Sequence, residues 1–191
     1  MKTLKRFFLT LCLILFALIL FIPLSIFVDS LFGRSRVENL TNITIQGVDN
    51  APDVRAYVVA PEGDGPFPTV IMIHEFYGIN ERLISKADLL AQAGYYVIVP
   101  DAFRGSTTAW IPRAIYQVIN SDQAQVNQDL DTVYAWLKNQ PEADMKRLGI
   151  IGFCYGGRVS LLYSLHNNKI VATVIFEEVL DDVLLEFKKN D

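Results

Sequence analysis

One short stretch, GIIGFCYGG at residues 149–157, constrains the fold of this chain more than any other. It continues an apolar run and then places glycines around a single cysteine, Cys154, at the spacing G-x-C-x-G-G. That spacing is typical of a nucleophile elbow, a sharp turn from a buried strand into a helix that exposes one reactive side chain. Glycines permit both the tight turn and close packing of the helix behind it. The stretch therefore predicts a strand, a turn at Cys154 and a helix in succession.

Cys154 at such a turn is a candidate nucleophile. The N-terminus of the helix that follows carries a partial positive charge, which favours the thiolate form. The backbone N–H of Tyr155, the next residue, would supply half of an oxyanion hole. The alternative is a buried structural cysteine, because free cysteines are among the most buried residues. A nucleophile would also need a base to accept its proton.

The remainder of the chain alternates between strand and helix patterns. Continuous apolar runs such as residues 69–74 suit strands that are buried on both faces of a sheet. The alternation predicts an α/β fold with a mainly parallel sheet and flanking helices. Expected strands cover residues 42–47, 54–60, 69–74, 95–100, 147–152 and 169–176; expected helices cover 80–94 (capped by Asn80), 112–118, a segment capped by Ser121 and ended before Pro141, and 158–165.

Candidate site residues follow two of these strands. Ligands of such sheets bind beyond the carboxyl ends of the strands. In HEFYGIN, residues 74–80, the backbone N–H of Phe76 could be the second oxyanion donor. Glu75 lies beside an apolar strand end, a setting that favours its protonated form and lets it handle a proton. In PDAFRG, Arg104 could pair with a substrate carboxylate. The alternative for each of the three is an ordinary loop residue.

The N-terminus predicts a membrane anchor. Residues 7–28 carry no charge, and a helix of that length crosses the hydrocarbon core, which is ~30 Å thick. A secretory signal peptide is the alternative, although its apolar core is usually only ~7–15 residues long. The expected organisation is a basic flank at 1–6, the anchor at 7–28, a linker at 29–40 and the α/β domain at 41–191.

Charge adds an orientation and excludes some functions. Lys2, Lys5 and Arg6 precede the anchor, against Arg34 and Arg36 after it, which favours a cytoplasmic N-terminus and an external domain. The net charge of −4 and the lack of a basic stripe argue against nucleic-acid binding. The two cysteines form no metal-site spacing. Because the first of them lies inside the apolar segment, no intramolecular disulfide is expected.

Taken together, HEFYG, VPDAFRG and GFCYGG, in this order and spacing, resemble the dienelactone hydrolase family, a branch of the α/β-hydrolases. The resemblance covers roughly residues 42–176. It implies hydrolysis of an enol lactone or a similar small ester through a thioester intermediate, without metal or cofactor.

The resemblance also implies a role for each candidate. Cys154 corresponds to the nucleophile, and Glu75 to the glutamate that contacts the resting thiol and helps to activate it. The backbones of Phe76 and Tyr155 correspond to the oxyanion donors. Arg104 is the nearest match to an arginine that holds the substrate carboxylate.

The catalytic triad is where the chain departs from the family, which adds an aspartate and then a histidine after the nucleophile. His166 is the only histidine after Cys154. It lies 12 residues along the following helix, roughly 18 Å away at ~1.5 Å per residue, too far for proton transfer. His74 precedes the nucleophile and has a structural role in the family. Glu177 and Glu178 follow a strand, where some α/β-hydrolases carry their acid, but no histidine is placed for them to orient.

The acidic tail EEVLDDVLLEFKKND also differs from the family and indicates a truncated or frameshifted reading frame, with a C-terminally incomplete sheet. Three hypotheses follow. The first is a membrane-anchored hydrolase that cleaves a lactone or small ester, with impaired catalysis in this chain. The second is a non-catalytic ligand-binding or interaction module on the same scaffold. The third, weaker, is a thiol-reactive protein that works without a histidine. The natural substrate and the oligomeric state stay open.

Overall fold

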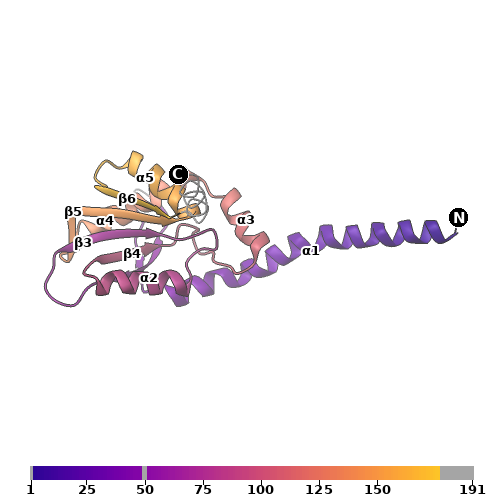
Figure 1. Ribbon diagram of the computed structural model, residues 1–191, viewed down its shortest axis with the longest axis horizontal. Coiled ribbons are helices and arrows are strands. Elements are labelled where there is room, and N and C mark those ends of the chain that lie inside the picture. Colours follow the sequence, from indigo (N-terminus) through magenta and orange to yellow (C-terminus); the bar gives the residue numbers. More distant parts are fainter. Residues whose placement is uncertain (1, 49–50, 177–191) are drawn as a thin grey trace, which may run out of the picture.

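The computed structural model describes residues 2–48 and 51–176 and has a mixed β-sheet at its centre, with helices on both faces (Figure 1). The strand order is β1-β2-β4-β3-β5-β6. The strands are β1 (Ile43–Ile45), β2 (Val54–Val59), β3 (Phe67–Ile73), β4 (Tyr96–Pro100), β5 (Ala143–Phe153) and β6 (Ala172–Phe176). The helices are α1 (Lys2–Leu40), α2 (Glu81–Gln92), α3 (Ile111–Ile119), α4 (Gln123–Leu137) and α5 (Tyr155–His166).

The pairing of the strands confirms the predicted fold class. β3 runs parallel to both β4 and β5, and β5 runs parallel to β6. β1 and β2 are antiparallel to their neighbours at the other edge. Parallel neighbours need a crossover, which α2 provides between β3 and β4, and α5 between β5 and β6. The carboxyl ends of β3, β4, β5 and β6 therefore meet at one edge of the sheet.

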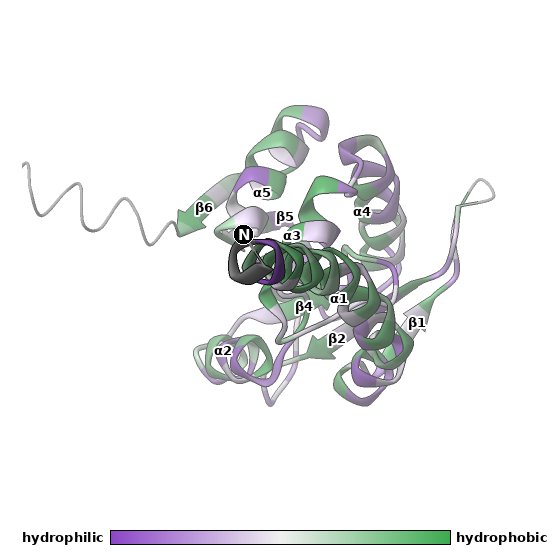
Figure 2. Ribbon diagram, turned by 90° about the vertical axis from the view of Figure 1, so that its right-hand side faces the viewer, coloured by the Kyte–Doolittle hydropathy of each residue, from purple (hydrophilic) through white to green (hydrophobic). Residues whose placement is uncertain are grey.

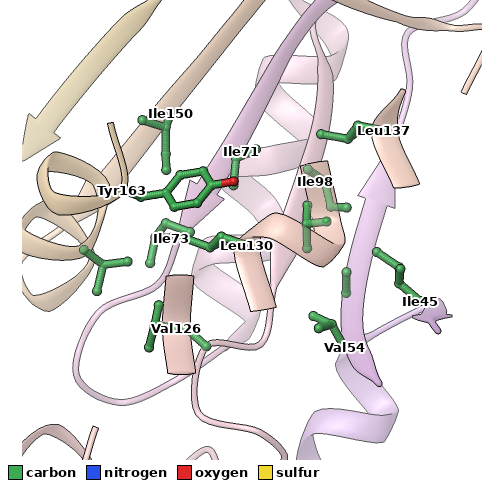
Figure 3. Packing of buried hydrophobic residues seen from close by; sticks show 14 of the residues in the cluster. Ile45, Val54, Ile71, Ile73, Ile98, Val126, Leu130, Leu137, Ile150 and Tyr163 are labelled. Atoms are coloured by element: carbon green, nitrogen blue, oxygen red, sulfur yellow. The ribbon is translucent and has the colours of Figure 1, made fainter. Parts of the chain in front are cut away.

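Alternate residues of the central strands pack into two separate cores. Ile71 and Ile73 of β3 point to the face that α4 and α5 cover, while Met72 between them points to the face that α2 covers. Figure 2 shows α2 on the opposite side of the sheet from α4 and α5. In the larger core, Val126 and Leu130 of α4 and Tyr163 of α5 pack against these strands (Figure 3). Burial on both faces explains why the strands read as continuous apolar runs.

Helix caps confirm one prediction and correct another. Asn80 is the N-cap of α2, and its side chain accepts a hydrogen bond from the backbone N–H of Leu83 at 3.0 Å. The prediction that Ser121 caps α4 is wrong, because Asp122 is the N-cap and accepts from the N–H of Ala124 at 2.9 Å. Asp122 lies one residue closer than Ser121 to the free N–H groups at the start of the helix.

The segment at 29–40, predicted as a linker, is helical. α1 continues through Pro23 and Gly33 to Leu40 without interruption. Val37 is fully buried, and Glu38 forms an ion pair with Arg55 of β2 at 3.1 Å. The last turns of α1 therefore pack as part of the domain, and these contacts keep them helical.

The first part of α1 projects away from the domain (Figure 1). Among the described residues, one helix is long and apolar enough to cross a membrane, at Lys5–Leu40, and no part of its most apolar window is buried. A signal sequence would meet the same criteria. The tail at 177–191, with Glu177 and Glu178, lies outside the described residues.

Candidate active site

Cys154 has the backbone of a nucleophile elbow. It lies between β5 and α5 with φ 52° and ψ −111°, a conformation that residues with a side chain rarely adopt. Its N–H donates a hydrogen bond to the carbonyl oxygen of Phe176 in β6 at 2.8 Å, which holds the turn. The side chain is exposed. The turn therefore presents the thiol beyond the sheet edge at the start of a helix, as the glycine spacing predicted.

The glycines around Cys154 are required by close contacts. A Cβ atom on Gly152 would lie 2.0 Å from the carbonyl oxygen of Gly156, and one on Gly156 would lie 2.5 Å from that of Ile73. A Cβ on Gly157 would lie 2.6 Å from the side chain of Ile175. Because these distances are shorter than van der Waals contact, only glycine lets α5 pack directly against β3 and β6.

The sheet register brings the loop after β3 to the same edge as Cys154. Ile73 pairs with Gly152, so Glu75 and Cys154 each follow this pair by two residues. The backbone N–H groups of Phe76 and Tyr155 donate to no other group in the described part of the chain. Two free donors beside an exposed thiol can stabilise an oxyanion. No hydrogen bond joins the half-buried Glu75 to Cys154 within the described ranges.

His74 has both ring nitrogens engaged. Nδ1–H donates to the carbonyl oxygen of Glu75 at 2.8 Å, and Nε2 accepts from the N–H of Ala102 at 3.1 Å. These partners set the neutral tautomer, and complete burial lowers the pKa of His74 to about 4. The ring therefore connects the loops after β3 and β4, and it cannot serve as a base for Cys154.

Aromatic side chains pack together next to the elbow. The ring of Phe103 lies 4.7 Å from that of His74 and 4.8 Å from that of Tyr155. The hydroxyl of Tyr155 is hydrogen-bonded to Ser121 at 2.5 Å, which gives Ser121 a role other than capping. These contacts hold the first residue of α5, and with it the backbone N–H of Tyr155, in a fixed position.

Arg104 lies in a loop that Asp101 organises. Asp101 accepts hydrogen bonds from the N–H groups of Phe103, at 3.1 Å, and Gly105. Its burial raises the pKa of Asp101 to about 6, despite these bonds. Arg104 itself has φ 52°, a second left-handed residue without the freedom of glycine.

The guanidinium of Arg104 already has a carboxylate partner. Nε and Nη2 donate to the two oxygens of Asp129 on α4, each at 2.9 Å, in a bidentate pair. Asp129 is buried, and sequence reasoning missed it. An acid among the apolar residues Val126, Leu130 and Val133 of one helix face is the signal that could have revealed it.

A cavity of about 170 Å³ adjoins this loop, between α3 and the start of α4. Arg113, on the inner side of α3, donates from Nη2 to Ser106 Oγ at 3.0 Å, and its buried Nε has no partner among the described residues. Gln117, one turn further along α3, is bonded to Ser106 and donates to the carbonyl oxygen of Phe76 at 3.3 Å. Gln117 therefore links the cavity wall to the loop after β3, and the lining also includes Arg104 and Arg113.

His166 lies at the opposite end of α5 from Cys154. Its Nε2 contacts Asp131 Oδ2 at 2.9 Å, and Tyr163 donates to the other oxygen of Asp131 at 3.1 Å. With α5 twelve residues long, the helix separates this pair from the elbow by about 18 Å.

A strained cysteine elbow at the carboxyl edge of a mixed sheet, with helices on both faces, defines an α/β-hydrolase fold. The sequence model of the dienelactone hydrolase family matches residues 54–182, so the chain belongs to that family. The resemblance seen in the three motifs is thereby confirmed.

Relatives and solved structures agree with this family. A "putative carboxymethylenebutenolidase" of Methylorubrum extorquens is 36% identical over 63% of this chain and 43% of the relative. One of Escherichia coli is 37% identical over 72% of this chain and 51% of the relative. The crystal structure of a "putative dienelactone hydrolase" from Klebsiella pneumoniae has a TM-score of 0.62 and 34% identity, covering 68% of this chain and 55% of that one. The chain thus spans about half the length of the curated relatives it matches.

Proposed function

We propose that this chain is a membrane-anchored hydrolase whose Cys154 attacks the carbonyl carbon of a lactone or small ester. The observation that carries the proposal is the elbow itself, an exposed thiol on strained backbone at the first turn of α5. Attack forms a carbon–sulfur bond and breaks the ester carbon–oxygen bond, so that an acyl thioester stays on the enzyme and the leaving oxygen takes up the thiol proton by way of Glu75. The N–H groups of Phe76 and Tyr155 stabilise the oxyanion, and Glu75 accepts the thiol proton.

A substrate carboxylate is proposed to bind in the cavity that Arg104 and Arg113 line. Asp129 already neutralises Arg104, whereas Arg113 donates to a hydroxyl within the described part of the chain. Arg113 therefore supplies the uncompensated positive charge. Arg104 contributes by fixing the loop and the wall of the cavity.

Release of the acyl group is proposed to be slow in this chain. Hydrolysis of the thioester needs a base that activates water, which is the usual task of a histidine. Both ring nitrogens of His74 are engaged, and His166 pairs with Asp131 at the far end of α5. The same observation favours a second candidate function, a ligand-binding module that retains the pocket without turnover.

p-Nitrophenyl acetate separates these outcomes. The full chain in detergent, with Cys12→Ser so that Cys154 is the only thiol, should release a burst of about one equivalent of nitrophenolate and then turn over slowly. Mass spectrometry should find the acetyl group on Cys154, and Cys154→Ala should abolish the burst. An absent burst would favour the binding module. Sustained turnover that disappears in Cys154→Ala would support the hydrolase but contradict its impairment.

The membrane anchor is a separate part of the proposal. The uncharged segment 7–28, its basic flank and the projecting, exposed first part of α1 support a single crossing with the N-terminus in the cytoplasm. Alkaline carbonate should leave the protein in the membrane pellet. Release into the supernatant, or a mature N-terminus near Ser30, would support a cleaved signal sequence instead.

A further inference from the structure

Helix α3 has its polar side chains on the inner face and its large apolar side chains on the exposed face, the opposite of what is expected for a surface helix. Its two polar side chains, Arg113 and Gln117, face inward and bond to Ser106. Ile111, Ile115 and Ile119 recur every four residues on the opposite face, and they are 55%, 50% and 76% exposed. Trp110, just before the helix, and Tyr116 are also exposed. The outward face of α3 therefore carries no charge.

This uncharged face lies beside the helix proposed to cross the membrane. The indole Nε1–H of Trp110 donates to Ser25 Oγ on α1 at 3.1 Å. Ser25 falls three residues before the end of the uncharged segment 7–28. Figure 1 shows α3 at the end of the domain from which α1 projects, oriented across the direction of α1. α3 is therefore placed at the depth where α1 would leave the bilayer.

Charges on α1 mark the same depth as the edge of the membrane. Asp29 is the first charged residue after the uncharged segment, and Arg36 pairs with it at 2.8 Å. Arg36 also donates to the carbonyl oxygen of Thr107, in the loop that leads to α3. Thus the charged contacts of α1 begin just beyond its uncharged segment.

We propose that α3 is an interfacial helix, with Ile111, Ile115 and Ile119 inserted between the headgroups and acyl chains of the bilayer that α1 crosses. The proposal rests on the anchoring of α1 proposed above. Trp110 and Tyr116 would then lie at the headgroups, where amphipathic aromatic rings are enriched. A helix with an apolar face and polar residues opposite lies in the plane of the interface.

Continuity with α1 identifies the occupant of this face as lipid. Leu24, Phe27, Val28 and Leu31 of α1 are exposed around the contact with Trp110. The apolar faces of α1 and α3 thus meet at one contact, and a bilayer can cover both at once. Since the inner face of α3 lines the cavity proposed above to bind a substrate carboxylate, that cavity would open next to lipid. Esters and lactones that partition into membranes are the substrate class that suits this arrangement.

An environment-sensitive label tests the insertion directly. In the full chain with Cys12→Ser and Cys154→Ala, a single cysteine at Ile119→Cys is labelled with nitrobenzoxadiazole and reconstituted into phosphatidylcholine vesicles. Leu165→Cys is the matched control, because Leu165 is 78% exposed but lies at the far end of α5. The label at position 119 should emit at shorter wavelength than at 165, and lipids with a shallow spin label should quench it at least about twofold more strongly. Adding Ile115→Glu should reverse the effect.

The outcomes separate insertion from anchoring. A label at 119 that behaves like the one at 165, while carbonate leaves the protein in the pellet, would overturn the insertion and keep the anchor. Blue-shifted emission without quenching by labelled lipid would mean that protein covers α3, and this too would overturn the insertion. Release by carbonate would overturn both.

Discussion

Cys154 and Arg104 both have a φ of 52°, but different contacts hold them there. At Cys154 the constraint comes from packing of glycines and from the bond to Phe176, and it presents a reactive atom to solvent. At Arg104 it comes from Asp101, which gathers the neighbouring N–H groups, and from the ion pair with Asp129. Strained backbone persists only where the surroundings enforce it. Arg104 is therefore a structural residue as much as a candidate ligand.

Matched substitutions separate the two arginines. Arg104→Met should lower the free energy of unfolding by about 1–3 kcal/mol, because it leaves the buried carboxylate of Asp129 unpaired. The loss is moderate because the side chain of Arg104 is itself partly exposed to solvent. Arg113→Met, which breaks a bond to a hydroxyl, should cost less than about 1 kcal/mol but weaken binding of a carboxylate-bearing ester. Denaturant unfolding and inhibition by such an ester measure both effects. Equal destabilisation by the two variants would contradict this assignment.

Two buried groups should make stability depend on pH in opposite directions. Below pH 6.5 the unfolded chain protonates His74, whereas the folded state, with a pKa of about 4, does not. This term lowers the free energy of unfolding as the pH falls from 6.5 to 4. Asp101 has a pKa of about 6 when folded against an ordinary 3.8, so the folded state holds the extra proton and gains stability over the same fall in pH.

Replacing either His74 or Asp101 should reveal the contribution of the other to the pH dependence of stability. His74→Asn should be less stable at pH 7, but its stability should fall less between pH 6.5 and 4.5 than that of the parent, by up to about 3 kcal/mol. Asp101→Asn should change the slope in the opposite sense. Denaturant unfolding at several pH values gives both slopes. If His74→Asn keeps the parental slope, the histidine is not neutral in the folded chain.

One of the close contacts that shape the elbow joins α5 to β3 at Gly156. Gly156→Ala would place a Cβ atom 2.5 Å from a backbone oxygen of β3. The clash is not easily relieved, because β3 is a central strand and its backbone can shift only if its neighbouring strands shift too. We expect a loss of about 1–3 kcal/mol of stability and slower alkylation of Cys154 by iodoacetamide. Gly149→Ala, on β5, is the control, since its Cβ would have its nearest contact at 3.4 Å. Comparable melting temperatures for the two variants would show that close packing at Gly156 is not needed.

Sequence reasoning succeeded where the pattern is local. The apolar runs of β3 and β4, the cap at Asn80 and the glycine elbow each follow from neighbouring residues, and the structure confirms all of them. Periodicity and turn chemistry act over a few residues, so one sequence is enough to detect them. The family motifs then indicated the edge of the sheet at which the candidate site lies.

Contacts between distant segments were not predictable in this way. The pair of Arg104 and Asp129 joins residues 25 positions apart, and only the fold makes them neighbours. The inward turn of Arg113 and Gln117 depends likewise on Ser106 and on the docking of α3. Gly33 and the mixed charges of residues 29–40 predict a linker, but the helical form of this segment and the burial of Val37 depend on packing that the local pattern does not indicate.

The junction between α1 and the domain depends on Val37. Val37→Asp would place a carboxylate in a buried apolar position, so the last turns of α1 should separate from the domain. Amide hydrogen exchange over residues 29–40 should then accelerate by about tenfold or more. Asn39→Asp adds the same charge at an exposed position of the same helix and should leave exchange unchanged. Equal acceleration in both variants would show that charge, not packing, controls this segment.

An unbroken α1 also fixes the direction in which the domain faces. Each residue of an α-helix advances the chain by ~1.5 Å along the helix axis and rotates it by about 100° around that axis. The number of residues between Ser25 and Val37 therefore sets both the distance of the domain from the uncharged segment and its rotation about α1. Inserting seven residues there would move the domain about 10 Å further from the uncharged segment and leave its rotation about α1 almost unchanged. Inserting two residues would instead turn Cys154 to the opposite side of the helix axis. The direction in which Cys154 faces, relative to the uncharged segment, therefore depends on the length of this helix.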